Sequence, residues 1–208
     1  MNSVFSYTLE WLLHNKLESF ASLLGIINIY FGIKEKPIFW FFGIINAIMF
    51  FVLYFQNKLY AYMMLQTYYM GLGVYGLYYW IKGGKKENNK KVVVNRAGIK
   101  KGIIIFLAFL MVFFAVYMLL KNYTDSVVPI MDSLSASSAI IAAYMMVKKH
   151  IECWFVWFAS DIVAVSLLFY KALYAALALQ ILYFAFTIIG YIEWRKSMLK
   201  STKKSANS

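Results

Sequence analysis

The sequence predicts an all-α membrane protein with seven transmembrane helices. Three observations carry this prediction: the composition, the alternation of basic residues between apolar segments, and an internal repeat. Of the 208 residues, 62% are hydrophobic and only 14% are charged, whereas soluble domains carry about 25% charged residues. The mean hydropathy is +0.65. A chain this apolar is typical of a polytopic membrane protein and leaves little room for a soluble domain.

Seven apolar segments are candidates for membrane spans, each of which needs about 20 residues. The fifth segment, SLSASSAIIAAYMMV, is short and rich in small residues. That composition favours close packing inside a helix bundle over exposure to lipid. We expect the spans at 18–33, 38–56, 60–81, 102–120, 133–147, 153–170 and 173–193.

The basic residues alternate between the gaps that separate these spans. One set of alternate gaps holds 17 of the 21 Lys and Arg residues, and the other set holds four. The rich side of a membrane protein is cytoplasmic, which predicts an outside N-terminus and a cytoplasmic C-terminus. The formal charge of +12 lies in short clusters between apolar runs, so it indicates orientation in a lipid bilayer and not nucleic-acid binding.

Residues 55–80 and 169–194 form an internal repeat. They match at nine of 26 positions with a constant offset of 114, which also pairs Trp40 with Trp154. Paired spans run in the same direction, so the sequence predicts two parallel three-helix repeats joined by a linker helix, a 3+1+3 arrangement. The expected parts are a first repeat at 1–81, a basic cytoplasmic loop with the linker helix at 82–132, a second repeat at 133–194, and a basic cytoplasmic tail at 195–208.

The sixth span carries an acid in its middle. Asp161 lies about 15 Å from the cytoplasmic end at 1.5 Å per residue, where a charge costs at least about 2.5 kcal/mol. Trp154, Trp157 and Asp161 are spaced three and four residues apart and therefore share one helical face. Two aromatic rings and a carboxylate suit an organic cation as substrate. A purely structural Asp161, protonated or bonded to a neighbouring helix, is the alternative.

Polar residues on other spans extend this candidate site. Asn46 lies at a similar depth in the second span, and Gln66 and Gln180 occupy repeat-related positions in the third and seventh. Amides in a membrane need hydrogen-bonding partners, so each could instead join helices. Tyr69 and Tyr183 follow the two glutamines on the same faces and could close a pore, stack on a ring or simply pack.

Other residue types exclude several functions. The sequence shows no catalytic set of Ser, His and acid, no phosphate-binding loop and no dinucleotide motif. One Cys and two isolated His residues offer no metal cluster. We therefore expect neither an enzyme nor a bound metal or cofactor. Trp80 and Trp194 precede Lys82 and Arg195, a position typical of the aromatic belt at the membrane interface.

The segment FFGIINAIMFFVLYFQNKLYAYMMLQTYYMGLGVYGLYYW at 41–80, together with WFVW, KALYA and the closing GYIEW, resembles the PnuC family of bacterial vitamin transporters. The resemblance covers about 17–196. It implies a seven-helix fold similar to a full-length SWEET transporter, a homotrimer in the inner membrane, and facilitated diffusion of nicotinamide riboside with trapping by a cytoplasmic kinase. It also implies that the WxxW motif, here Trp154 and Trp157, binds the substrate together with Asn46, Gln66 and Asp161.

One departure from the family pattern leaves the vitamin open. Nicotinamide riboside transporters tend to carry Asn at the position of Asp161. Nicotinamide riboside and thiamine both carry a fixed positive charge on an aromatic ring, so the acid suits either of them. Neutral riboflavin fits an ionised acid less well. A hypothesis from a different class is a membrane scaffold or sensor whose polar residues only hold helices together.

Overall fold

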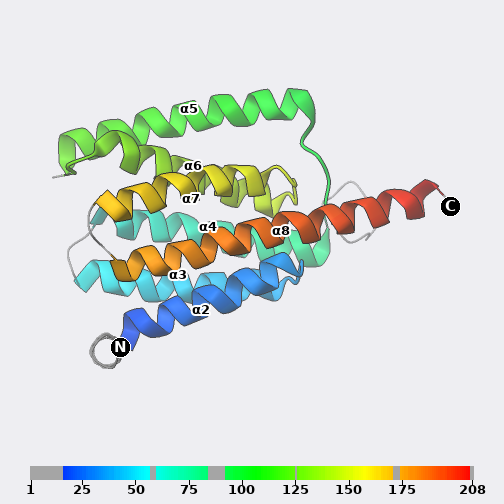
Figure 1. Cartoon of the computed structure of the whole chain (residues 1–208), viewed down its shortest axis with the longest axis horizontal. Helices are drawn as coiled ribbons and strands as arrows, with labels where there is room; N and C mark the ends of the chain where they lie inside the picture. Colours follow the sequence, from blue (N-terminus) through cyan, green and yellow to red (C-terminus); the bar gives the residue numbers. More distant parts are fainter. Residues whose placement is uncertain (1–15, 57–59, 84–91, 125, 171–173, 207–208) are drawn as a thin grey trace. The chain divides into compact units, whose positions relative to one another are not determined.

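The computed structural model describes residues 16–56, 60–83, 92–124, 126–170 and 174–206, and the structural statements below concern these ranges. They form seven helices and no named strand (Figure 1). The helices divide between two compact units, 1–82 and 83–208, which are described separately. In order, the helices are α2 (Lys16–Ile33), α3 (Ile38–Gln56), α4 (Tyr60–Lys82), α5 (Gly98–Tyr123), α6 (Pro129–Val147), α7 (Cys153–Tyr170) and α8 (Tyr174–Ala206).

The first unit contains α2, α3 and α4. Helix α3 packs against both α2 and α4. A tight turn joins α2 to α3: Glu35 has a φ of 54°, and Pro37 precedes the first turn of α3, where its missing N–H costs little. The buried residues of α3 are Trp40 and Ala47.

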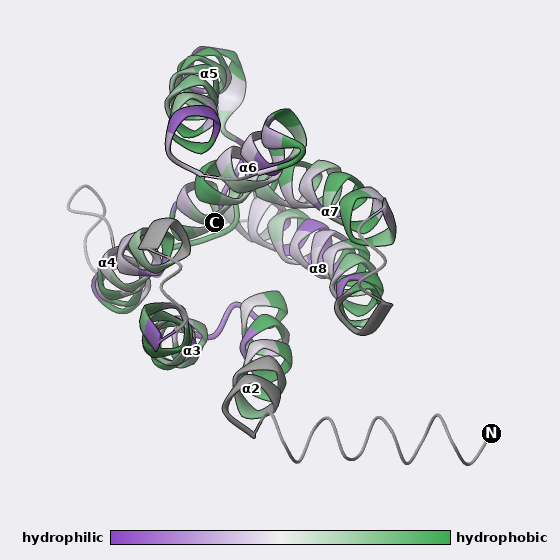
Figure 2. Cartoon of the chain, turned by 90° about the vertical axis from the view of Figure 1, so that its left-hand side faces the viewer, coloured by the Kyte–Doolittle hydropathy of each residue, from purple (hydrophilic) through white to green (hydrophobic). Residues whose placement is uncertain are grey.

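The second unit contains α5, α6, α7 and α8, and each helix packs against the next in sequence. Small residues let α6 approach its neighbours closely, as the sequence predicts; Ser133, Ser137 and Ala142 are wholly buried. Ser160 of α7 donates a hydrogen bond to the carbonyl of Ser135 on α6, at 3.3 Å. Helix α5 has no buried residue and is hydrophobic over most of its circumference (Figure 2), as a lipid-facing helix is.

The seven predicted spans coincide in position with the seven described helices. Five of these helices, α3, α5, α6, α7 and α8, are long and apolar enough to cross a membrane. In α2 the segment Leu23–Ile33 is an apolar helix shorter than a full span, and α4 is diluted by Tyr, Gln and Gly. That α2 and α4 also span the membrane stays a prediction.

Helix α8 extends past the predicted end of the seventh span. The span was expected to end at 193 and to be followed by a basic tail, which stays a prediction, and α8 continues as one helix of 33 residues to Ala206. The segment RKSMLKSTKKSA contains no Gly or Pro, and Lys, Arg, Met and Leu are good helix formers. Glu193 and Lys196 form an ion pair one turn apart, at 3.0 Å, which adds modest local support.

The same arrangement of two tryptophans and a glycine occurs in both units. In the first unit Trp40 packs over Gly76, and its ring meets that of Trp80 edge to face, with centroids 5.5 Å apart at 87°. This contact, together with that of Gly73 against Ile44, brings α3 and α4 close together. A Cβ atom at Gly76 would collide with the Trp40 ring.

In the second unit Trp154 packs over Gly190 and meets Trp194 edge to face, with centroids 5.4 Å apart at 89°. All four indole rings are at most 5% exposed. The expectation that Trp80 and Trp194 form an interfacial belt is therefore incomplete, because their rings face partner helices of their own unit. Each contact is placed by a glycine four residues before the second tryptophan.

A short clasp joins the segment before α5 to the turn between α6 and α7. Asn95 N–H donates to the Lys149 carbonyl and Ile151 N–H donates to the Asn95 carbonyl, both at 3.0 Å. The Asn95 side-chain Nδ2 donates to the Lys148 carbonyl at 3.3 Å. This leaves Oδ1 as an acceptor 2.6 Å from His150 Nδ1, so His150 must donate from Nδ1.

The surroundings of His150 favour its neutral form. Burial lowers the pKa of His150 from its ordinary value of 6.5; nearby Lys101 and Lys148 lower it further, and Glu152 opposes them. The Glu152 carboxylate accepts the Ala97 N–H at 3.1 Å, directly before α5, where a negative charge is favourable. With a folded-state pKa below that of the unfolded chain, the clasp stabilises fully above about pH 6.5 and loses this contribution as the pH falls through the lowered value.

We expect the clasp to loosen on mild acidification. The protection factors of the Asn95 and Ile151 amides, measured by hydrogen exchange and corrected for the intrinsic rate, should fall between about pH 7 and pH 5. The control variant is His150→Gln, which keeps a hydrogen-bond donor but does not titrate, and its protection should stay constant over this range. Equal protection of the unaltered protein at both pH values contradicts the expectation.

Candidate functional site

The centre of the candidate site is Asp161, at the midpoint of α7. It lies eight residues after Cys153 and nine before Tyr170, about 12 Å from either end of the helix. Its side chain is only 5% exposed. Gln180 Nε2 donates to Oδ1 at 2.7 Å and Thr187 Oγ1 donates to Oδ2 at 2.8 Å. Both donors come from α8, so the acid also joins the two helices.

The described surroundings of Asp161 contain neutral donors and no Lys or Arg partner. A buried carboxylate is costly unless it is paired or well hydrogen-bonded. Hydrogen bonds from an amide and a hydroxyl stabilise the ionised form, but they leave its charge in place. Each carboxylate oxygen can accept about two hydrogen bonds, so about half of the acceptor capacity remains for a ligand.

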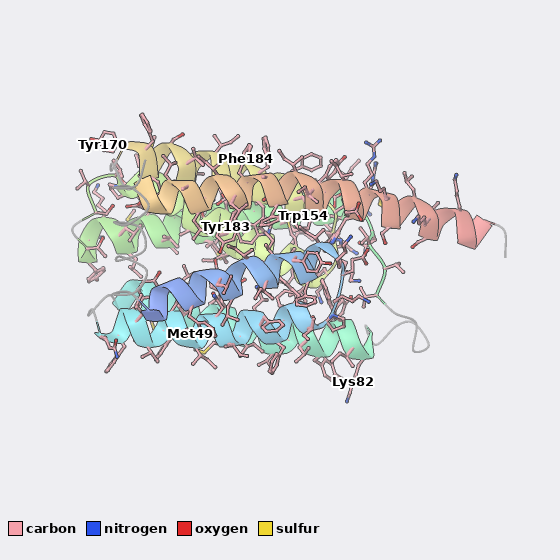
Figure 3. The ribbon with its side chains drawn as sticks, turned by 60° about the horizontal axis from the view of Figure 1, so that its bottom comes forward. Met49, Lys82, Trp154, Tyr170, Tyr183 and Phe184 are labelled. Atoms are coloured by element: carbon pink, nitrogen blue, oxygen red, sulfur yellow. The ribbon has the colours of Figure 1, made fainter. Side chains whose placement is uncertain are left out.

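The two tryptophans of the WxxW motif have different surroundings. Trp154, labelled in Figure 3, is 2% exposed. Its ring lies against Gly190 and Trp194. Its indole N–H finds no acceptor among the described residues, so packing alone holds the ring. Trp157, one turn nearer to Asp161, is partly exposed, and its contact with a ligand stays a prediction. Substrate contact by Trp154 stays a prediction.

The remaining predicted residues divide between the two units. Gln180 and Tyr183 share the face of α8 that carries Thr187, and the Tyr183 carbonyl lies 3.1 Å from Thr187 Oγ1. In the first unit Gln66 is buried, whereas Asn46 and Tyr69 are partly buried. The structure thus brings Asp161 and Gln180 into contact. The predicted convergence of the first-unit residues on the same site is a proposal and is taken up below.

Thr187 is the site residue that sequence reasoning did not single out. It is 4% exposed and bonds directly to the acid. The available signal was its spacing, because Thr187 follows Gln180 by seven residues, two helical turns, and therefore lies on the same face. A single threonine in an apolar helix is otherwise inconspicuous, since its hydroxyl commonly bonds back to the preceding turn.

The fold and the site together define a polytopic helical membrane protein with a buried acid at the centre of its candidate site. The family model described as Nicotinamide mononucleotide transporter matches residues 15–196. The chain belongs to this family, whose members are transporters and not enzymes. The resemblance to the PnuC family is thereby confirmed.

Similarity to individual proteins is distant but extends over most of the chain. Nicotinamide riboside transporter PnuC of Escherichia coli (strain K12) is 22% identical over 193 residues, covering 81% of this chain and 78% of the relative. PnuC of Neisseria mucosa is 25% identical over 190 residues, covering 86% and 72%. The riboflavin/roseoflavin transporter RibM of Streptomyces davaonensis is 26% identical over 175 residues, covering 84% and 82%.

A solved structure agrees with the fold. The crystal structure of the vitamin B3 transporter PnuC superimposes with a TM-score of 0.72 at 22% identity, covering 94% of this chain and 88% of that chain. This likeness supports the helical architecture described above.

Proposed function

We propose that this chain carries nicotinamide riboside across the bacterial inner membrane by facilitated diffusion, with trapping by a cytoplasmic kinase. The observation that carries the proposal is the buried Asp161 carboxylate, held by Gln180 and Thr187 without a described cationic partner. Family membership supports transport, and the names of the PnuC relatives support this substrate.

A positively charged ring fits this site on physical grounds. An ionised Asp161 inside the membrane is costly, and a cationic ligand offsets that cost while it is bound. The partly exposed Trp157, one turn away, offers a ring face for cation–π attraction. Thiamine satisfies the same requirement and is the second candidate. The name of one relative supports riboflavin as the substrate, but riboflavin is neutral and gains no electrostatic attraction from the acid.

The transport mechanism that we propose uses the internal repeat. Two parallel three-helix repeats, joined by α5 as the linker in a SWEET-like 3+1+3 arrangement, rock about a site near the membrane midplane. In this arrangement the first repeat contributes Asn46, Gln66 and Tyr69, and the second contributes Gln180 and Tyr183. The proposed repeats are residues 1–81 and 133–194. We further propose an outside N-terminus, a cytoplasmic C-terminus and a homotrimer.

The test is thermal stabilisation of the purified protein by nicotinamide riboside, thiamine, riboflavin and nicotinamide mononucleotide. A ligand at 100 times its dissociation constant stabilises by about 2.7 kcal/mol. We expect a clear rise in melting temperature with nicotinamide riboside and none with riboflavin. The mononucleotide should bind more weakly, because its phosphate meets an anionic site.

The outcomes separate the alternatives. If only thiamine raises the melting temperature, the substrate is thiamine and remains a cationic vitamin. If only riboflavin raises it, the site does not recognise its ligand by charge. No shift with any ligand favours a scaffold or sensor. Uptake into vesicles should survive collapse of the proton gradient, and a strict requirement for the gradient contradicts facilitated diffusion.

A further inference from the structure

Thr187 has two acceptors within reach and one proton to donate. Its Oγ1 lies 2.8 Å from Asp161 Oδ2 and 3.1 Å from the carbonyl oxygen of Tyr183. A threonine hydroxyl donates one hydrogen bond at a time. When it donates to the main chain, Oδ2 loses its donor; when it donates to Oδ2, both oxygens of the acid are held, since Gln180 holds Oδ1.

The first repeat lacks the acid and the hydroxyl together. At the offset of 114, Ala47 corresponds to Asp161 and Gly73 corresponds to Thr187, whereas Gln66 corresponds to Gln180. Ala47 is 2% exposed, so the equivalent position is buried in both units. The Trp–Gly–Trp contact is common to both repeats, which shows that repeat packing does not require a threonine here. The second repeat therefore has both Thr187 and Asp161, and the first repeat has neither at the corresponding positions.

Fixing both oxygens gives the carboxylate one orientation. The acid then presents its remaining acceptor sites in a constant direction, and its charge stays available because neither donor is charged. Thr187 donates directly to Oδ2 of Asp161, so its hydroxyl influences a ligand bound at the acid through the orientation of that carboxylate.

We propose that Thr187 is a positioning residue that sets the preference of the site for a cationic ligand over a neutral ligand of the same shape. The proposal rests on the proposed function. It assigns charge selection to the pair of Asp161 and Thr187, and thus to the second repeat, because the first repeat has Ala47 and Gly73 at those two positions and keeps only the neutral amide Gln66.

The experiment compares two ligands that differ in charge. Nicotinamide riboside is cationic, and its reduced dihydro form keeps the ribose and nearly the same outline without the charge. Dissociation constants for both are measured on the purified full-length protein and on Thr187→Val, which keeps the side-chain shape but removes the hydroxyl. The expected loss is about 10-fold to 100-fold in the preference for the cation, the worth of one hydrogen bond to a charged group.

Controls distinguish positioning from general packing. Thr187→Ser keeps the hydroxyl and should keep the preference. Thr187→Ala removes the hydroxyl without a β-branched side chain and replaces the Val variant if that variant fails to assemble. Affinity for the neutral ligand should change by less than about threefold in the hydroxyl-free variants. An equal loss for both ligands, or an unchanged preference, overturns the role of Thr187.

The failures of the two proposals are distinguishable. If the unaltered protein binds neither ligand, the proposed function fails and the role of Thr187 fails with it. If the unaltered protein prefers the cation and Thr187→Val keeps that preference, the role of Thr187 alone is overturned.

Discussion

Replacing Asp161 by Asn is expected to weaken binding of nicotinamide riboside by at least about 30-fold, because truncating one partner of a buried charge pair costs 2–5 kcal/mol or more. The substitution keeps the shape of the side chain and removes its charge. The new amide also faces two donors, Gln180 and Thr187, and can accept from only one of them through its oxygen. Calorimetry on the purified protein, with the cation and with its neutral dihydro form, measures the effect.

The matched control is Glu193→Gln, which removes another carboxylate from the same unit. Glu193 pairs with Lys196 on the helix surface, six residues beyond Thr187 along α8, so both affinities should stay unchanged. Affinity for the neutral ligand should vary by only a few-fold in Asp161→Asn. If that variant binds the cation as well as the unaltered protein does, the carboxylate does not select charge. If it fails to assemble, the acid serves to hold helices, as the scaffold hypothesis states.

Replacing Gly190 by Ala is expected to lower the free energy of unfolding by about 1–3 kcal/mol, the usual cost of overpacking. The added Cβ would collide with the ring of Trp154, which is itself fixed against Trp194. The ring must therefore move, and α7 with it. Gly76→Ala makes the corresponding change against Trp40 in the first unit and should destabilise in the same direction. Melting of the purified protein measures both.

The control for these variants is Gly102→Ala in α5. No atom lies within 4 Å of a Cβ at Gly102, and removing a glycine from a helix is stabilising by roughly 0.5–1 kcal/mol. A melting temperature of Gly190→Ala at or above that of the unaltered protein contradicts the close contact. Such a result would also weaken the equivalence of the two repeats, since the contact is their common feature.

Much of the fold could be predicted because apolar runs and breaks in them are local signals. The positions of all described helices follow from hydrophobic segments. The offset of 114 pairs Trp40 with Trp154, but it did not predict that both rings pack over a glycine. The length of α8 could not be predicted in this way, because the change from apolar to basic residues at Arg195 marks the end of a membrane span but not the end of a helix. Helix propensity, and not hydropathy, decides that boundary.

The candidate site could be predicted only in part. Spacing places Trp154, Trp157 and Asp161 on one face, but it does not say which face of α8 meets them. The hydrogen bonds from Gln180 and Thr187 depend on the rotation of one helix against the other, which small residues such as Gly190 allow. Likewise, the basic residues after Trp194 predicted an interfacial ring, whereas the nearby glycine directs that ring against its neighbour.

The unbroken length of α8 has a mechanical consequence. From Trp194 to Ala206 the helix continues for 12 residues, about 18 Å of stiff rod. A flexible tail would not follow a tilt of the helix. Because α8 is rigid, a small rotation near Gln180 displaces its lysine-bearing C-terminal end by a larger distance. A label on the last turns of α8, which lie beyond the predicted membrane span, would therefore report a tilt of this helix with high sensitivity.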